Sequence, residues 1–148
     1  MNVIARHRRA SFDYDITEKM IAGLVLSGSE VKSVKAGHVS LKGSFIVAHN
    51  GELYLVNAHI NPYSFAAVNH EPTRSRKLLL HRKQVDQVSQ ALDQAGLSAV
   101  PLVIGVERGL IKLEIGIGRG KKRFDKRETT MRREAAREAA RAISDKHQ

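Results

Sequence analysis

The fold is decided by residues 100–117, which read VPLVIGVERGLIKLEIGI. Two apolar, β-branched segments, 100–106 and 110–117, flank the turn dipeptide Arg108-Gly109. This pattern is typical of two antiparallel strands joined by a tight turn. The hairpin predicts a β-rich domain, and the rest of the chain has to supply the strands that pair with it.

Four further strands are predicted upstream from runs of β-favouring and alternating side chains. Between the first two, residues 15–18 suit a turn, and between the last two Asn50-Gly51 is the strongest hairpin signal in the chain. A long loop of residues 61–73 follows this hairpin, and its length suggests a function. The predicted strands are residues 11–16, 20–26, 41–48 and 52–60.

Two helices are predicted between the strands. Ser27 and Glu30 have the spacing of a capping box, so a short helix is expected to begin at Ser27 and to end at a left-handed Gly37. A longer helix is predicted over residues 74–95, where apolar side chains recur at helical spacing until Gly96 ends it.

These elements favour a mainly β fold, because strands and helices do not alternate as they do in a parallel sheet. Short antiparallel strands with one helix before the closing hairpin fit a small Greek-key barrel of the OB type. The sequence has 148 residues, and we expect residues 1–118 to form this single domain, with two or three helices in the whole chain. A basic C-terminal tail, residues 119–148, follows it.

The tail carries eleven Lys and Arg against five Asp and Glu, which supplies +6 of the chain's net charge of +10. Beyond Arg127, its large apolar side chains are Met131 and Ile143, so burial cannot offset the entropy lost when the tail becomes ordered. Alanines and i,i+3 pairs of Glu with Arg favour a helix that is marginal in water. We expect the tail to be disordered when free and helical when bound to a polyanion.

The sequence argues against several classes of protein. It has no Cys, which excludes disulfides and thiolate chemistry, and its longest apolar run, residues 99–106, is too short to cross a membrane. No signal-peptide pattern follows Met1, so we expect a cytoplasmic protein with no membrane partner. The seven His form no metal-ligand doublet and no catalytic motif is present, so we expect no catalytic residue, no cofactor and no metal.

A run of alternate glycines, Gly116, Gly118 and Gly120, resembles part of a phosphate-binding loop. The motif is incomplete and no apolar helix follows it. We therefore expect these glycines to form a flexible hinge between the barrel and the tail.

Basic side chains are concentrated in residues 74–83, which contain five Lys and Arg and no acidic residue. Cations near the start of the predicted helix oppose its dipole, so this arrangement favours a phosphate partner over simple solvation. Lys32 and Lys35 lie on the polar face of the shorter helix, where RNA contact and simple solvation are equally compatible with the sequence.

The aromatic content distinguishes two kinds of RNA binding. A domain that grips single strands stacks bases on aromatic side chains, whereas this chain has only four Phe, three Tyr and no Trp, placed mainly as core residues. The body is therefore expected to recognise a folded RNA by shape and backbone. Phe124 is the exception, because it stands among basic residues and is expected to stack on a base.

Several motifs resemble, in their order along the chain, those of the SsrA-binding protein family, also called small protein B. The most specific are residues 74–81, RSRKLLLH, and residues 120–127, GKKRFDKR. The other matching stretches are Arg8-Arg9-Ala10, Ala22-Gly23-Leu24, Glu30-Val31-Lys32-Ser33, His59-Ile60-Asn61-Pro62-Tyr63 and Val100-Pro101-Leu102.

The resemblance implies an OB-type, non-enzymatic RNA-binding adaptor that binds the tRNA-like domain of transfer-messenger RNA and delivers it to stalled ribosomes for trans-translation. The tail would enter the empty mRNA channel and become helical on small-subunit rRNA, and the protein is expected to be monomeric. The body residues expected to contact RNA are His7, Arg8, Arg9, Lys32, Lys35, Arg74, Arg76, Lys77, Leu79 and His81. The tail residues expected to contact RNA on the ribosome are Arg119, Lys121, Lys122, Phe124, Asp125, Lys126, Arg127, Arg132 and Arg133.

Three positions depart from the family's usual pattern. His7 stands where the family usually has Asn, Ile21 stands where it usually has Glu, and residues 40–45, SLKGSF, stand where it has Asn-x-x-Asp-Ser-Tyr. The first two positions belong to the family's RNA-facing surface. We hypothesise that His7 donates a hydrogen bond where Asn would.

Two other functions are compatible with the composition. A ribosomal or initiation-type OB protein would bind rRNA and ignore transfer-messenger RNA. An OB-fold nuclease would require a carboxylate metal site and would cleave RNA in the presence of a divalent metal.

Overall fold

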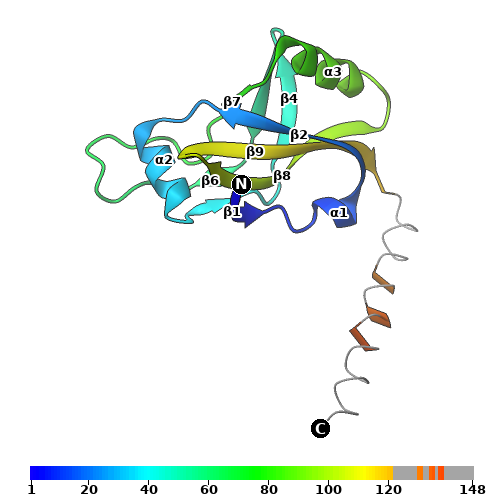
Figure 1. Cartoon of the computed structure of the whole chain (residues 1–148), viewed down its shortest axis with the longest axis horizontal. Coiled ribbons are helices and arrows are strands. Elements are labelled where there is room, and N and C mark those ends of the chain that lie inside the picture. Colours follow the sequence, from blue (N-terminus) through cyan, green and yellow to red (C-terminus); the bar gives the residue numbers. More distant parts are fainter. Residues whose placement is uncertain (122–129, 132–133, 136, 139–148) are drawn as a thin grey trace.

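The structure of the protein is a computed structural model that describes residues 1–121, 130–131, 134–135 and 137–138 (Figure 1). The helices and strands, in chain order, are β1 (Asn2–Arg6), α1 (Ala10–Asp13), β2 (Tyr14–Leu24), α2 (Gly28–Lys35), β3 (Val39–Ser40), β4 (Phe45–His49), β5 (Glu52–Val56), β6 (His59–Ile60), β7 (Arg76–Leu79), α3 (Arg82–Leu92), β8 (Leu97–Glu107) and β9 (Leu110–Gly120). The described residues beyond Lys121 have helical backbone. No described helix is long and apolar enough to span a membrane.

The main sheet is a closed antiparallel ring. Its strands lie in the order β1-β8-β4-β5-β7-β2-β9, and β8 also pairs with β9, which closes the ring from β8 round to β9. The pairing of β4 with β8 within this ring is a single bridge, between Ile46 and Ala99. β1 continues along the same edge of β8, and β3 pairs with β6 in a separate small sheet. The predicted mainly β antiparallel barrel with helices is confirmed.

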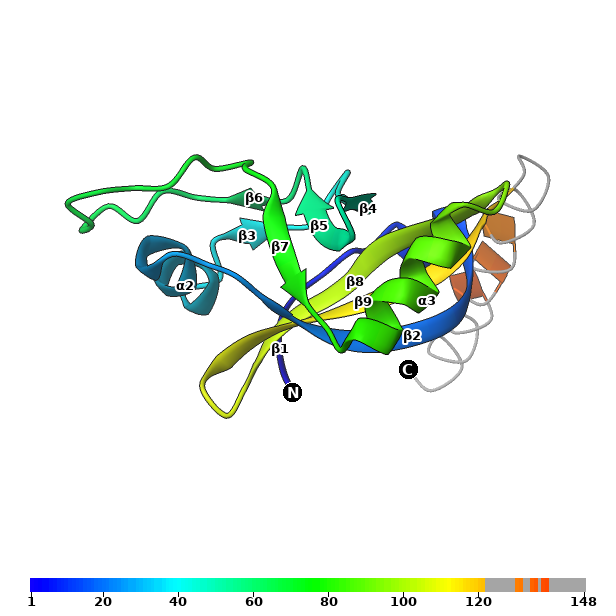
Figure 2. The ribbon, with the colours of Figure 1, turned by 90° about the horizontal axis from the view of Figure 1, so that it is seen from above.

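The helices lie at different ends of this barrel (Figures 1 and 2). α3 packs against β8, β4 and β5, where Val85 and Val88 enter the core. α2 lies at the other end, beside the loop between β6 and β7, and that loop extends past α2 in both views.

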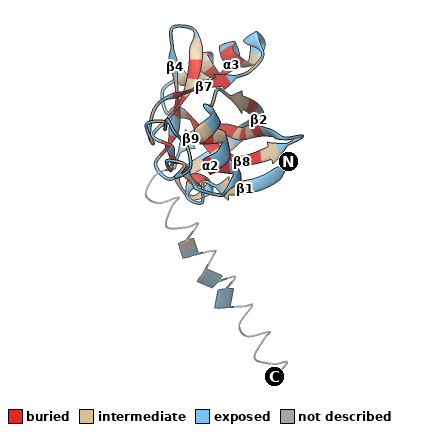
Figure 3. Ribbon diagram, turned by 90° about the vertical axis from the view of Figure 1, so that its left-hand side faces the viewer, coloured by how far each residue is buried: buried red, intermediate tan, exposed pale blue. Residues whose placement is uncertain are grey.

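The core draws residues from every side of the barrel, and β9 supplies a larger share of it than any other strand. On β9, every second residue from Ile111 to Ile117 is buried, and Ala22 and Ile104 join the same cluster from β2 and β8. Figure 3 shows buried segments on the elements that face the interior and exposed segments at the loops. The hairpin predicted from residues 100–117 is therefore present. β8 begins three residues before its predicted start, and β9 ends three residues after its predicted end.

Local signals in the sequence are confirmed where they depend on neighbouring residues. Asn50 and Gly51 have φ of 50° and 76° in the turn that joins β4 to β5. The Ser27–Glu30 capping box is present at the start of α2, and Gly37 has φ of 85° just beyond its end. The strands around the hairpin are shorter than expected, because Asn57 takes φ of 66° and ends the extended run.

The N-terminal prediction needs two corrections. Residues 10–13 form α1 instead of a strand, and β2 then runs without interruption from Tyr14 to Leu24. The expected turn at residues 15–18 is a β-bulge between Ile16 and Glu18. Its polar residues suggested a turn, but they lie on the outer side of a strand that pairs with β9 along most of its length.

The predicted helix over residues 74–95 is wrong in its first and last parts. Residues Arg76–Leu79 form β7, which pairs with β5 and β2 and so completes the ring, and α3 spans only Arg82–Leu92. Leu78 fits the helical spacing of the later apolar residues, yet it is buried from a strand. The macrodipole argument for this basic cluster therefore applies only to Arg82 and Lys83.

The glycine run is a packing feature inside β9, and the prediction of a hinge there is wrong. A Cβ built on Gly118 would lie 2.2 Å from the Asp15 carbonyl oxygen, and one built on Gly116 would lie 2.9 Å from side-chain carbons of Ile16 and Leu102. The absence of side chains lets β2 cross β9 closely at its bulge. β9 continues to Gly120, so Arg119 and Gly120 belong to a strand instead of the start of the tail.

Gly118→Ala should destabilise the protein by roughly 2 kcal/mol or more, because the added methyl group overlaps backbone that cannot move without breaking the β2–β9 pairing. Gly120→Ala is the matched control, since nothing lies within 4 Å of its Cβ position. Urea unfolding of both variants measures the difference. Equal stability of the two variants would show that the strands are not this closely packed.

Candidate RNA-binding surface

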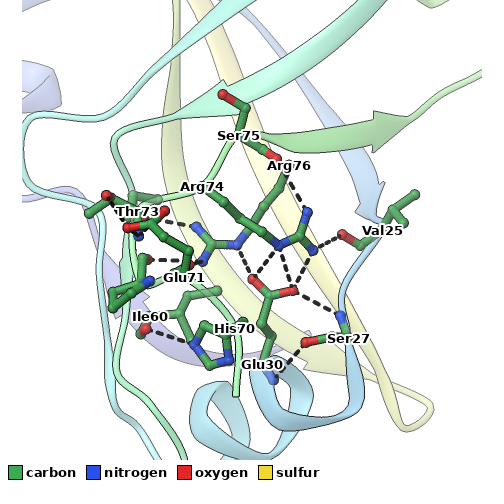
Figure 4. Close-up of polar contacts among 12 residues, drawn as sticks. Val25, Ser27, Glu30, Ile60, His70, Glu71, Thr73, Arg74, Ser75 and Arg76 are labelled. Atoms are coloured by element: carbon green, nitrogen blue, oxygen red, sulfur yellow. Dashed lines mark hydrogen bonds and ion pairs between the residues drawn. The ribbon is translucent and has the colours of Figure 1, made fainter. Parts of the chain in front are cut away.

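One end of the barrel is organised by a buried carboxylate, Glu30 of α2 (Figure 4). The Nε of Arg74 donates to both carboxylate oxygens at 3.1 Å, and the Nε of Arg76 donates to Oε2. The Ser27 N–H donates to Oε1 at 2.8 Å, which is the capping-box bond. A single carboxylate therefore joins the start of α2 to β7 and to the loop before it.

Arg76 is fully buried, and each of the three nitrogens of its guanidinium group donates a hydrogen bond. Its Nη1 donates to the Ala58 carbonyl at 2.9 Å and its Nη2 donates to the Pro72 carbonyl at 2.9 Å. A buried guanidinium is stable only when its charge is paired and its N–H groups are satisfied. Both conditions hold here, and Arg76 therefore has a structural role.

The pKa of Glu30 follows from these contacts. Burial alone would raise it, but hydrogen bonds from Arg74, from the Ser27 N–H and from Arg76, together with the charge of Arg76, lower the pKa to about 2. The ion cluster of Glu30 with two arginines consequently stays charged throughout the neutral pH range.

Four of the five cations in residues 74–83 form ion pairs within the protein, although they share two carboxylates, Glu30 and Glu52. Arg74 is only about a third exposed and holds Glu30, while Lys77 and Arg82 lie 3.8 and 3.1 Å from the carboxylate of Glu52. The expectation that Arg76 contacts RNA is wrong, because its side chain is inaccessible. Arg74 is partly exposed and already holds Glu30, so its contact with RNA stays a prediction.

Leu79 is exposed and belongs to an apolar patch on the outer face of β2. Gly23 of β2 pairs with Leu79 of β7, and a Cβ built on Gly23 would lie 3.3 Å from the Leu79 Cβ. Ile21 and Val25, on the same side of β2 as Gly23, are 44% and 45% exposed, and Leu79 is 52% exposed. We call Ile21, Val25 and Leu79 the apolar patch. His81 is exposed at the N-cap of α3, two residues further along the chain.

The second cluster lies where the N-terminal strand meets α1. A cleft of about 560 Å³ is lined by the basic side chains of Arg6, Arg8, Lys19 and Lys121 and by His7, together with two carboxylates, Asp15 and Glu114, and other polar and apolar residues. Lys19 and Ile21 are alternate residues of β2, so they share its outer face. Lys19 was not among the predicted contacts, because it is a single Lys between the expected turn at residues 15–18 and the next expected strand.

His7 is fixed against the barrel by two bonds. Its backbone N–H donates to the Leu102 carbonyl at 2.8 Å, and its ring Nδ1 is 2.8 Å from the Pro101 carbonyl. A carbonyl only accepts, so this contact assigns the proton to Nδ1 and leaves Nε2 as an acceptor in the neutral ring. A neutral His7 would therefore offer RNA an acceptor at Nε2, and a protonated ring would offer the donor that the hypothesis requires.

A larger cleft of about 1,020 Å³ lies on the other side of His7. It brings Arg6, Arg8, Arg9 and Lys42 together between β1 and the loop that leads to β4. Arg9 is partly engaged, since it lies 3.6 Å from Asp13 and over the Phe12 ring. Arg6 and Lys42 were not singled out in the sequence, because they come from two separate segments.

The remaining expected contacts fall into three groups. Lys32 and Lys35 are exposed on α2, beside the loop between β6 and β7. Arg119 and Lys121 are tied to the body, because Arg119 donates to the Ala95 carbonyl at 2.9 Å and the Lys121 Nζ donates to the Ser11 carbonyl at 2.8 Å. The other tail residues lie outside the described part of the chain: Lys122, Phe124, Asp125, Lys126, Arg127, Arg132 and Arg133.

The described residues contain no group of three or more His, Asp or Glu side chains that could hold a metal ion. The described surface offers positive charge and apolar contact.

Comparison with known proteins assigns the family. A family model described as SmpB protein matches residues 4–145. The chain belongs to the SmpB family. SsrA-binding protein from Halalkalibacterium halodurans, an SmpB relative, is 51% identical over 146 residues, covering 98% of this chain and 95% of that protein.

Other members agree over similar lengths. SsrA-binding protein from Syntrophotalea carbinolica is 47% identical over 148 residues, with 99% of each chain covered. An SmpB-like chain of the solved structure "tmRNA-SmpB: a journey to the center of the bacterial ribosome" superposes with a TM-score of 0.68 at 44% identity. The superposition covers 85% of this chain and 93% of that one. The resemblance found in the sequence motifs is therefore confirmed at the level of the family.

Replacing Glu30 with Gln should destabilise the protein by about 3 kcal/mol or more, because two guanidinium groups, one fully buried, lose their counter-charge. Glu52→Gln is the control: Glu52 also pairs with two cations, but these are exposed, so its loss should cost about 1 kcal/mol or less. Urea unfolding at neutral pH measures both variants. Similar losses would contradict a buried structural role for Glu30.

Glu30→Gln should also change how the free energy of unfolding depends on pH in acid. Because the folded-state pKa of Glu30 is lowered from 4.5 to about 2, its contribution is fully present above about pH 4.5 and is lost as the pH falls toward 2. The wild type should lose stability over this window more steeply than Glu30→Gln. Parallel curves for the two proteins would contradict the lowered pKa.

Proposed function

We propose that this protein is an RNA-binding adaptor that binds the tRNA-like domain of transfer-messenger RNA and delivers it to stalled ribosomes for trans-translation. The observation that carries the proposal is the family match over residues 4–145, supported by a tmRNA–SmpB structure with the same fold. The surface described above is consistent with this role, because it combines cations with an apolar patch on a rigid barrel.

The cations proposed to hold RNA phosphates are those that the protein does not neutralise. Within residues 1–121, neither Arg8 nor Lys19 forms an ion pair, and both line the smaller cleft with His7. Releasing counterions from RNA requires charges that can approach phosphates, which the buried Arg76 cannot do and which Lys77 and Arg82 do only in competition with Glu52. We assign phosphate binding to Arg8 and Lys19, with His7 accepting a hydrogen bond through Nε2.

The apolar patch would contact the same RNA beside Lys19, through Ile21 of β2 and Leu79 of β7. Ile21 and Leu79 are adjacent across Gly23 and cannot hydrogen-bond, so they would pack against ribose or exposed base faces. Such contacts recognise the shape of a folded RNA more than its sequence. The replacement of the usual Glu by Ile21 is then compatible with binding through shape.

The tail is proposed to act on the ribosome as a separate part, by entering the empty mRNA channel and becoming helical on small-subunit rRNA. One contact supports a fixed point of departure: the Lys121 N–H donates to the Asp13 carbonyl at 2.8 Å. The tail would therefore leave the body beside α1, close to the cleft of His7 and Arg8. The adaptor is proposed to act in the cytoplasm and to catalyse no reaction.

The function is tested by competition. The full-length protein should bind the tRNA-like domain at near-physiological salt, and the complex should survive excess ordinary tRNA and unstructured RNA, because shape is recognised as well as charge. Labelled tRNA-like domain and a filter-binding or gel-shift readout are sufficient. Absent binding of the labelled domain, or its displacement by small-subunit rRNA fragments at lower concentrations than by unlabelled tRNA-like domain, would instead identify an rRNA-binding protein of the ribosomal or initiation type.

Arg8→Gln and Lys19→Gln should each weaken binding of the tRNA-like domain and flatten its salt dependence. Each lost phosphate contact should reduce the slope of log K against log salt by about 0.7 to 0.9, the range measured for single- and double-stranded nucleic acid. Arg82→Gln is the matched control, because this exposed arginine is already paired with Glu52 and Asp86. An equal effect in all three variants would mean that the charge acts only generically.

A further inference from the structure

The loop between β6 and β7, residues 61–75, is held in place from within. The side chain of Asn69 accepts from the Tyr63 N–H at 2.8 Å and donates to the Tyr63 carbonyl at 2.9 Å, which closes the loop near its tip. The ring of His70 bridges the Ser29 hydroxyl at 2.8 Å and the Ile60 carbonyl at 2.9 Å, which ties the base of the loop to α2. The loop is therefore preorganised in spite of its length.

The tip enclosed by the Asn69 clamp presents apolar groups to solvent. Phe65 is 87% exposed and Val68 is 85% exposed, the largest values among the large apolar side chains of the described residues. The Tyr63 ring meets Phe65 at a centroid distance of 5.7 Å in an edge-to-face arrangement. At 87% exposure, the Phe65 ring has an open face.

The charge around this aromatic pair is positive. The Lys32 ammonium lies 5.5 Å from the centroid of the Tyr63 ring, and Lys35 is exposed one turn further along α2. The nearest carboxylates in the sequence are engaged, because Glu30 is buried against two arginines and Glu71 binds Thr73. An exposed aromatic ring supported by a cation is the arrangement that binds unpaired bases and their phosphates.

We propose that the tip of this loop is a second RNA contact, in which an unpaired base stacks on Phe65 while Lys32 approaches its phosphate. The contact is separate from the surface of β2 and the His7 cleft, since the loop extends past α2 at its own end of the barrel (Figures 1 and 2). The proposal rests on the RNA-binding role proposed above, and it adds single-base recognition to a body that otherwise recognises shape. A protein partner is less compatible with the tip, because the flanking charge of Lys32 and Lys35 favours a polyanion.

The absence of Trp from the chain makes a direct test possible. In Phe65→Trp, the new side chain is the only Trp, and stacking on a base should quench its fluorescence when transfer-messenger RNA or small ribosomal subunits are added to the full-length protein. Leu110→Trp is the control, because Leu110 is also exposed, at 61%, but lies at the β8–β9 turn. Quenching in the Phe65 variant alone is the expected result.

Substitutions at the tip give the second measurement. Phe65→Ala should weaken binding to the RNA that quenches the Trp variant by about five-fold or more, the range of one base–aromatic stack. Phe65→Tyr, which keeps a ring, should restore it, and Phe65→Leu, which keeps only apolar bulk, should not. A full rescue by Leu would overturn stacking in favour of simple apolar contact.

The outcomes separate this inference from the proposed function. If the wild type fails to bind the tRNA-like domain in the competition assay, the proposed function fails. If the wild type binds but Phe65→Trp is not quenched by either transfer-messenger RNA or small subunits, only the stacking proposal is overturned. A blue shift of the emission without quenching, on addition of small subunits, would instead place Phe65 against a ribosomal protein and would also overturn it.

Discussion

The pairing of one buried carboxylate with two arginines is the constraint on which this end of the molecule depends. Taking Glu30 and Arg76 out of water is costly, and the cost is offset only because every polar atom in the cluster has a partner. The network joins α2, β7 and the connections on either side of β6. A cluster of this kind fixes one geometry, since a shifted β7 would leave a buried charge unpaired.

That constraint changes how the charge of the protein should be interpreted. A net charge of +10 suggests a uniformly basic surface, but several of the cations in the most basic stretch of the body serve the fold. Arg74, Arg76, Lys77 and Arg82 are paired with Glu30 or Glu52. The cations left for a partner are dispersed in sequence and converge only in space, as Arg8 and Lys19 do at one cleft. Binding specificity then arises from which charges the protein leaves unpaired.

The sequence predicted most of what is determined locally. The Asn50-Gly51 turn and the Ser27–Glu30 capping box depend on four neighbouring residues, and both are present. The strand at Arg76–Leu79 could not be predicted in this way, because it is short and its partners on β5 and β2 are more than twenty residues away. The family was recognised from its motifs despite these errors.

The same limit applies to the candidate site. Arg76 was predicted to bind phosphate because no acidic residue lies near it in the sequence. Its counter-ion, Glu30, lies 46 residues upstream, where the sequence already assigned it a local role in the capping box. Lys19 was hidden within a strand that resembled a turn because of its bulge. In both cases the missing information was which residues the barrel brings together. Residue type alone identified the partner class but not the residues that contact it.

Strand pairing in the barrel is uneven. β4 and β8 pair through the single bridge between Ile46 and Ala99, whereas β9 forms long ladders with β2 and with β8. Local opening follows the weakest line of hydrogen bonds, and in this protein α3 covers that line by packing on β4 and β8. We therefore expect the β4–β5 hairpin to open more readily than the ladder between β2 and β9. Lys19 and Ile21 lie on β2, in that longer ladder, so they can present a fixed surface to an RNA.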